Sequence, residues 1–198
     1  MTQALLLAGF KSPSSSAQRC FRAVLGALAE PGIPQRLDAP QEAPAGCQKG
    51  IASIGLSLLD SSTSFYVHDL SGLSGYLRFH TGAADSPPQA AQWVFAGASG
   101  PDLLLLTQSL NMGSLECPEQ AATLVLQLDQ PPTEPMVLRL RGPGIQGARS
   151  LPSFGIPAEF WAWRQAVRAR YPLGLDLLLV FAEQVWAIPR STVILAEL

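Results

Sequence analysis

Two histidines are the side chains of this sequence best suited to bind or polarise a substrate. His68 and His80 each end a segment that we predict to be a β-strand, where active-site groups of α/β sheets are often found. A histidine that is only hydrogen-bonded within the fold remains the favoured interpretation for each. A metal site would need more ligands than two histidines supply, so we expect no bound metal.

Anion binding is the second chemistry that the residues allow. Residues 141–147, RGPGIQG, carry glycines whose backbone amides could approach an anion. Pro143 removes one of those donors and no helix follows directly, so a plain tight turn is favoured. Arg19 and Arg22 on a predicted helix could also hold an anion, although such a pair usually lies on a solvated face. Neither the P-loop motif nor the dinucleotide-binding glycine motif occurs.

Lysines and cysteines are too few or too scattered for the sites they commonly build. Enzymes that use pyridoxal phosphate hold it through a lysine Schiff base, and neither of the only lysines, Lys11 and Lys49, follows a predicted strand. We therefore predict no such adduct and no other cofactor. Cys20, Cys47 and Cys117 are odd in number and form no C-x-x-C pair, which indicates neither a disulfide framework nor a zinc site.

Three further charged residues lie where predicted elements begin or end. Asp60 ends a helix, Asp176 opens an apolar strand, and Arg190 follows Pro189 near the carboxyl end of the chain. Each could be tied to backbone amides or to another charge in an ion pair. We favour such a structural role over catalysis for all three.

The composition indicates a surface that is either weakly polar or covered by other protein. Only 14% of the 198 residues are charged and mean hydropathy is +0.20, whereas a typical soluble domain has about 25% charged residues. A weakly polar surface of this kind is typical of subunits with buried contacts. The net charge is −2 and no basic tract is present, so nucleic acid is not an expected partner.

The sequence also argues against a membrane or secreted protein. The longest stretch without Asp, Glu, Lys or Arg is 86–101, which three prolines interrupt and which is too short to span a bilayer. Residues 1–10 lack the basic start and the small-residue cleavage site of a signal peptide. We predict a cytoplasmic protein.

Hydrophobic periodicity predicts short helices and strands mixed along one domain, residues 1–198. Predicted helices are Ser14–Glu30, Cys47–Leu59 and Pro157–Arg170, with a helical turn at Leu103–Leu106. Predicted strands are Ser64–Val67, Gly75–Phe79, Trp93–Ala96, Thr123–Leu128, Met136–Arg141, Asp176–Phe181 and Val185–Ile188. This mixture indicates an α/β fold with helices on both sides of a mixed sheet.

Two of these elements have predicted faces that can be checked. The first helix should bury its apolar residues at helical spacing, namely Phe21, Val24, Leu25 and Leu28. The helix at 157–170 should carry Arg164 and Arg168 on a different side from Phe160. The strands at 123–128 and 136–141 should form a hairpin around a turn at 130–135, with Arg139 and Arg141 on its polar face.

Seven segments in order resemble the PhnH family, a subunit of the bacterial carbon-phosphorus lyase system. The segments are residues 21–24 with 31–32, 58–60, 77–82, 118 with 122–124, 140–145, 172–176 and 188–192. Each segment alone is weak evidence for the family. All seven in the right order are specific, and together they span nearly the whole chain. Residues 83–99 depart from the family pattern, which leaves the helix boundaries there open.

The resemblance implies a three-layer α/β/α sandwich similar to a reduced pyridoxal-phosphate transferase without the lysine. It also implies a homodimer that joins other carbon-phosphorus lyase subunits in a cytoplasmic complex. With them, it would help to attach an alkylphosphonate to the ribose of ATP, which displaces adenine and gives a ribose 1-phosphonate 5-triphosphate. ATP and the alkylphosphonate are then the ligands of the complex.

Two roles for this subunit stay open. It is either a non-catalytic structural partner, which we favour, or it lends anion-binding groups to the ribosyl-transfer site. Candidates for the second role are Arg78, His80, Thr81 and Arg190, because they lie at predicted strand ends and suit anions. We predict no catalytic residue, since no nucleophile constellation supports a free-standing hydrolase or transferase.

Overall fold

The structure is a computed structural model that describes residues 7–99, 102–131 and 137–195. Its α-helices are α1 (Pro13–Ala29), α2 (Lys49–Leu58), α3 (Leu73–Thr81), α4 (Leu103–Ser109) and α5 (Ala158–Arg168). A larger sheet holds β1 (Gln35–Arg36), β2 (Ser64–His68), β3 (Ala84–Asp85), β4 (Trp93–Gly97), β5 (Thr123–Gln127), β8 (Asp176–Phe181) and β9 (Gln184–Ile188). A smaller sheet holds β6 (Val137–Arg141), β7 (Arg149–Pro152) and β10 (Val193–Leu195).

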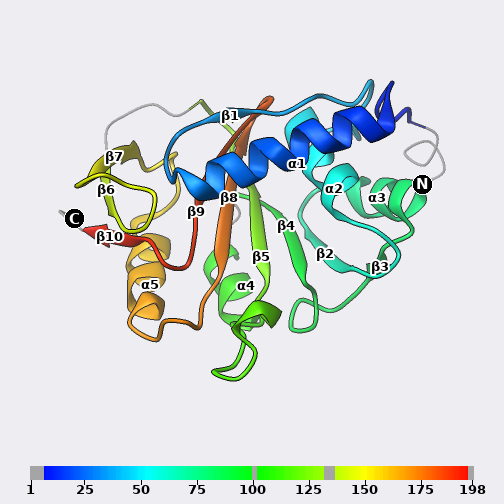
Figure 1. The fold of residues 1–198 in the computed structure, drawn as a ribbon. Coiled ribbons are helices and arrows are strands. Elements are labelled where there is room, and N and C mark those ends of the chain that lie inside the picture. Colours follow the sequence, from blue (N-terminus) through cyan, green and yellow to red (C-terminus); the bar gives the residue numbers. More distant parts are fainter. Residues whose placement is uncertain (1–6, 100–101, 132–136, 196–198) are drawn as a thin grey trace.

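The larger sheet is mixed, as the sequence predicts. Its strand order is β1-β9-β8-β5-β4-β2-β3 (Figure 1). Strands β8, β5, β4, β2 and β3 are parallel neighbours, and β9 runs antiparallel to both of its neighbours, β8 and β1. The parallel strands therefore all end on one side of the sheet. We call this side, where β2, β4, β5 and β8 end, the carboxyl edge, and the opposite side the amino edge.

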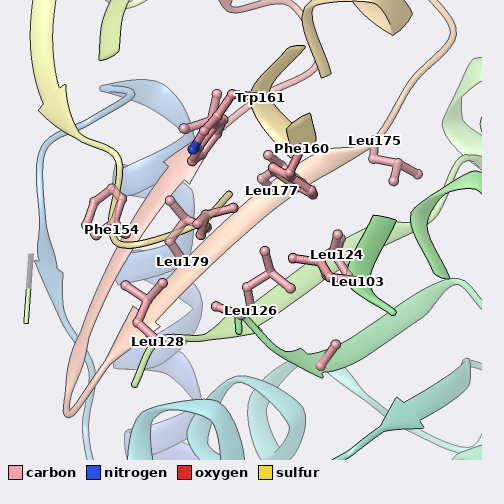
Figure 2. Packing of buried hydrophobic residues seen from close by; sticks show 14 of the residues in the cluster. Leu103, Leu124, Leu126, Leu128, Phe154, Phe160, Trp161, Leu175, Leu177 and Leu179 are labelled. Atoms are coloured by element: carbon pink, nitrogen blue, oxygen red, sulfur yellow. The ribbon is translucent and has the colours of Figure 1, made fainter. Parts of the chain in front are cut away.

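Helices cover both faces of this sheet, so the predicted α/β class is confirmed. On one face α1, α2 and α3 pack over side chains such as Val125 and Leu178. On the other face α4 and α5 pack over the alternate residues, among them Leu124, Leu126 and Leu179 (Figure 2). Strands that are buried on both faces read as continuous apolar runs, which is why β5 and β8 were predictable.

The predicted hairpin at 123–141 is wrong. β5 lies inside the larger sheet between β4 and β8, whereas β6 pairs with β7 and β10 in the smaller sheet. β5 is apolar on both faces and so requires two covered sides, which a two-stranded hairpin cannot give. The predicted turn at 130–135 falls mostly on residues outside the described ones. The alternation in β6 is confirmed, with Leu138 and Leu140 buried and Arg139 and Arg141 exposed.

The predicted strand Gly75–Phe79 is also wrong, because this segment is the middle of helix α3. Gly72 and Gly82 bound the helix, both with positive φ, which glycine adopts without strain. Leu73, Tyr76 and Leu77 are buried at the i, i+3, i+4 spacing of one helix face. Tertiary burial of this face outweighs the β propensity of the aromatic residues.

The predicted apolar face of α1 is only partly right. The helix buries mostly small side chains, Ser16, Cys20, Ala23, Val24 and Ala27, whereas Phe21 and Leu25 are 51% and 55% exposed. Small residues let α1 pack closely on α2 and β9, across which it runs in Figure 1. As a result, the side chains of Phe21 and Leu25 lie on the outer side of α1 and are about half exposed.

The remaining predicted helices and strands are confirmed. The helices predicted at 14–30, 47–59 and 157–170 begin and end within two residues of α1, α2 and α5. The predicted turn at 103–106 is the start of α4. The strands predicted at 64–67, 93–96, 123–128, 176–181 and 185–188 correspond to β2, β4, β5, β8 and β9. None of the helices among the described residues has the length and hydropathy needed to cross a bilayer.

Candidate functional site at the carboxyl edge

The carboxyl edge has the topology at which open α/β sheets bind ligands. After β2 the chain passes through α3 to β3 on one side, and after β4 it passes through α4 to β5 on the other side. The crevice between such diverging connections is the usual ligand site of this fold class. His68 ends β2 at this point and is aligned with Ala96 of β4, so the sequence correctly placed one polar side chain at the edge.

Two glutamines join the start of α2 to this edge. The side-chain oxygen of Gln127 accepts a hydrogen bond from the Gln48 backbone N–H at 2.7 Å, and its amide nitrogen donates to the Gly46 carbonyl at 2.9 Å. Gln48 in turn donates to the Leu128 carbonyl at 2.6 Å and accepts from the Ala182 N–H at 2.7 Å. Both side-chain amides are thus satisfied and hold α2 against β5 and β8.

Neither glutamine was predicted as a site residue. Gln127 is 6% exposed and is the one polar residue at the end of an otherwise apolar strand, which was the available signal. A buried amide of this kind needs partners, because an unsatisfied buried polar group costs about 1–3 kcal/mol. Its partners lie some 80 residues away in sequence, at separations of 79 and 81, and no local pattern reveals them.

Two hollows flank this glutamine network. The first, which we call the Asp129 cavity, has a volume of about 370 Å³, and the second, the Lys49 hollow, about 650 Å³. The Asp129 cavity is lined by Ala98, Ser99, Asp129, Gln130, Pro131, Phe154 and Gly155. The Lys49 hollow is lined by Arg36, Cys47, Gln48, Lys49, Phe181, Ala182, Glu183 and Gln184.

Charges in the Lys49 hollow largely neutralise one another. Arg36 and Glu183 form an exposed ion pair with a separation of 3.6 Å between Nη2 and Oε2. The ammonium group of Lys49 then supplies the net positive charge of the residues that line the hollow. Exposed pairs of this kind contribute little to stability, about 0–1 kcal/mol. Burial raises the pKa of the Cys47 thiol to about 11, so that the nucleophilic thiolate is scarce at neutral pH. The hollow thus lacks an activated cysteine.

We expect Cys47 to be alkylated slowly at pH 8. With a pKa of about 11 its thiolate fraction there is about 0.001, against roughly 0.2 for an ordinary cysteine, so the rate should fall roughly 200-fold on folding. The measurement is iodoacetamide labelling of the Cys47 peptide, by mass spectrometry, in the folded chain and in urea. The rate should keep rising as pH passes 9 and 10. A plateau near pH 8.5 would contradict the raised pKa.

Three of the predicted anion-binding residues lie together on the last turn of α3, away from the carboxyl edge. Arg78 pairs with Asp85 at 3.3 Å, and Nε2 of His80 donates to the Leu7 carbonyl at 2.9 Å. The Thr81 hydroxyl donates to its own helix, at 2.7 Å from the carbonyl of residue 77. Their placement at a strand end was wrong because the segment is helical.

Arg190 lies at the amino edge, apart from those three. Its guanidinium donates to Oδ2 of Asp176 at 2.6 and 3.1 Å and to the Pro118 carbonyl, and its backbone N–H donates to Oδ1 at 2.7 Å. Strands β5 and β4 lie between β8, which carries Asp176, and β2, which precedes α3. At the usual strand spacing, β8 and β2 are therefore about 14 Å apart. The structure therefore does not bring the four candidates into one site. Asp176 and Arg190 thus have the kind of structural partners that the sequence favours for them, a backbone amide and an opposite charge, although the sequence did not pair them with each other.

We expect Arg190→Ala to lower the free energy of unfolding by about 2 kcal/mol, because it leaves Asp176 without its partner in a mostly buried setting. His80→Ala removes one exposed hydrogen bond and should cost about 1 kcal/mol or less. Urea denaturation of both variants measures this difference. If these residues only fix the fold, assembled complexes of either variant should keep near-normal turnover. A tenfold loss of turnover with unchanged stability would instead assign them to substrate.

The other charged candidates also have structural partners. Asp60 accepts hydrogen bonds from the backbone and hydroxyl of Ser62 at 2.8 and 2.6 Å in the turn after α2. The Arg19 guanidinium lowers the pKa of the Asp38 carboxyl, to which it donates at 2.9 Å. The prediction that Arg164 lies on a different side of its helix from Phe160 is wrong, because both residues are 1% exposed. Burial lowers the pKa of the Arg164 guanidinium to about 10.

The glycine-rich segment forms the tight turn that its sequence favours. Residues 142–145 form a tight turn in which the Ile145 N–H donates to the Gly142 carbonyl at 3.2 Å, so the turn interpretation is confirmed. Gly144 has φ +76° and a side chain there would collide with the Ala29 carbonyl. In the part of the chain that the structure describes, no three His, Cys, Asp or Glu side chains are placed to hold a metal ion together.

The fold and this edge define an α/β domain of the class that binds small ligands beyond the carboxyl ends of parallel strands. Residues 8–195 match the family described as bacterial phosphonate metabolism protein (PhnH), and the chain belongs to that family. It is 33% identical over 175 residues to "Putative C-P lyase subunit protein HtxG" of Stutzerimonas stutzeri, covering 88% of this chain and 84% of the relative. It is 31% identical over 192 residues to "Alpha-D-ribose 1-methylphosphonate 5-triphosphate synthase subunit PhnH" of Rhizobium meliloti (strain 1021), covering 92% of each.

Proposed function

We propose that this protein is a subunit of a carbon-phosphorus lyase complex in the cytoplasm. In it, the chain would help to form ribose 1-alkylphosphonate 5-triphosphate from ATP and an alkylphosphonate, by a structural or binding role rather than by its own catalysis. The observation that carries the proposal is the match over 92% of the chain to a subunit of a ribose 1-methylphosphonate 5-triphosphate synthase. A likeness of the fold to pyridoxal-phosphate transferases stays a prediction.

Exposed apolar side chains support a role that depends on partners. Large hydrophobic residues are more than half exposed on both helix layers, and the loops add others: Phe21, Leu25, Phe79, Leu105, Leu115 and Tyr171. Exposed apolar side chains that lie next to one another, as Phe21 and Leu25 do at i, i+4 spacing on α1, are typical of protein contacts. Together with the low charge content, it favours the structural alternative over the one in which Arg78, His80, Thr81 and Arg190 hold substrate.

The test is reconstitution with the other subunits of a carbon-phosphorus lyase complex from the same source. We expect the chain to co-purify with them in fixed stoichiometry. Formation of the ribose 1-phosphonate from ATP and methylphosphonate should require its presence, while the chain alone should be inactive. Product formation at the full rate without this chain, or no association with any subunit, would contradict the proposal.

We also propose that the isolated chain is a homodimer. The low charge content and the exposed apolar helix faces leave more surface to cover than one 198-residue chain covers by itself. Light scattering after size exclusion, at micromolar concentration and neutral pH, should give twice the 21.1 kDa mass of the chain. A stable monomer under these conditions would overturn the dimer but not the assignment to the complex.

A further inference from the structure

The Asp129 cavity at the carboxyl edge has the size and the mixed polar and apolar lining of a small-ligand site. Its volume of about 370 Å³ falls in the range of small-ligand sites, about 300–1,000 Å³. Residues 98–99 and 129–131 follow β4 and β5, and residues 154–155 follow β7 of the smaller sheet. The cavity therefore lies where the connections of the two sheets meet.

One wall of the cavity is apolar and fixed in position. Phe154 has φ +59°, a conformation that a bulky residue adopts at a cost of about 1–3 kcal/mol. Its ring is 5% exposed and packs edge-to-face on Trp186 at 5.3 Å between ring centroids, in the cluster of Figure 2. Ala98 and Pro131 line the cavity beside it. Such a wall suits the C–H face of a small ring rather than a fully hydrated ion.

Two polar side chains of the cavity, Asp129 and Ser99, offer mainly acceptors, whereas the amide of Gln130 can both donate and accept. The Ser99 hydroxyl donates to Oδ2 of Asp129, so its only hydrogen is used within the protein. Oδ1 of Asp129 and the lone pairs of Ser99 remain as neighbouring acceptors. Neither lysine nor arginine is among the described residues that line the cavity, so its charge is negative. Phosphate, triphosphate and phosphonate groups are therefore repelled, and a ligand with two adjacent donors is favoured.

We propose that the Asp129 cavity binds the vicinal diol of a ribose, whose hydroxyls donate to Asp129 and Ser99 while the sugar ring lies against the Phe154 wall. A carboxylate at the carboxyl end of a strand binds ribose hydroxyls in the same way in dinucleotide folds. The inference rests on the proposed function, since it names the part of the substrate that this subunit holds. The anionic groups of that substrate must then be held elsewhere in the complex.

The test uses the full chain and neutral probes. Adenosine, 2′-deoxyadenosine and 3′-deoxyadenosine are titrated into the ¹⁵N-labelled protein, and amide shifts are followed by NMR. We expect adenosine to shift the amides of Ser99, Asp129 and Gly155, and loss of either hydroxyl to weaken binding about tenfold. Asp129→Asn should weaken adenosine binding at least tenfold without lowering the melting temperature. Asp102→Asn, which removes the same charge at the start of α4 from a residue that does not line the cavity, should bind as the wild type does.

Three results would overturn the inference: equal binding of the deoxynucleosides, shifts confined to residues elsewhere, or no adenosine binding at millimolar concentration. Binding of spermidine but not of adenosine would make this a cation site and would also overturn it. The proposed function is tested separately by assembly. If the complex forms and Asp129→Asn leaves its KM for ATP unchanged, the diol site fails while the function stands. If the wild-type chain binds adenosine but joins no complex, the function fails while the diol site stands.

Discussion

Gly50→Ala is expected to destabilise the protein by about 3 kcal/mol, although alanine favours helices over glycine. A Cβ at this position in α2 would lie 2.3 Å from the Ala182 carbonyl oxygen and 2.8 Å from Cγ1 of Val180. The nearest obstacle is backbone, which cannot rotate away as a side chain can. The Gly50 N–H also donates to the same carbonyl at 2.9 Å, so the start of α2 would have to leave the β8–β9 turn.

Gly26→Ala in α1 is the matched control for this prediction. A Cβ there would meet only the Gln35 side chain at 3.5 Å, an ordinary contact, so the substitution should stabilise the protein by about 0.5–1 kcal/mol. The two variants make the same chemical change in helices and should move the free energy of unfolding in opposite directions in urea. Equal effects would mean that α2 does not approach β8 as closely as the structure has it. Loss of stability in Gly50→Ala should also loosen Gln48 and with it the edge of both hollows.

The parts of the fold that could be predicted are those in which a single local pattern decides the outcome. β5 and β8 are apolar except at their ends, which is typical of central strands, and α2 is apolar on more than one side, which is typical of an interior helix. α3 could not be predicted because its short sequence satisfies both a strand and a helix, and burial of Tyr76 and Leu77 against α2 decides between them. For α1, the identity of the buried face depends on how closely its neighbours pack, which its own sequence does not contain.

The candidate site was harder to predict than the fold. Its polar groups come from loops that are far apart in sequence, and each is unremarkable in its own segment. Ser99 and Asp129 are ordinary turn residues until β4 and β5 are known to be parallel neighbours, which brings their ends together. The ionic groups that do stand out, Arg190 and Asp176, belong to a structural pair at the opposite edge. Charge alone therefore directs attention to the amino edge of the sheet rather than to the carboxyl edge.

The second large effect is expected from the exposed face of α1. Phe21 and Leu25 are neighbours at i, i+4 spacing, and the hollow between Ala17 of the same helix and His80 of α3 continues this surface toward the exposed Phe79. We expect the double variant Phe21→Glu, Leu25→Glu to weaken assembly with the carbon-phosphorus lyase subunits at least 100-fold. Covering each half-exposed side chain contributes about 1 kcal/mol, and two glutamates buried in the same contact would cost more.

Phe21 and Leu25 are about half exposed in the isolated chain, so the double variant should lose only about 1–2 kcal/mol of unfolding free energy and stay folded. Measuring the unfolding free energy of the variant therefore distinguishes loss of the contact with the other subunits from unfolding of the chain. Leu105→Glu on α4 is the control, because this leucine is also more than half exposed, at 66%, but lies on the opposite helix layer. For all variants, co-purification and the binding constant with the other subunits are measured. Light scattering of the isolated chain measures self-association separately. If Leu105→Glu releases the chain and the α1 variant does not, the contact lies over α4 and α5, and the helix layer of α1 faces solvent.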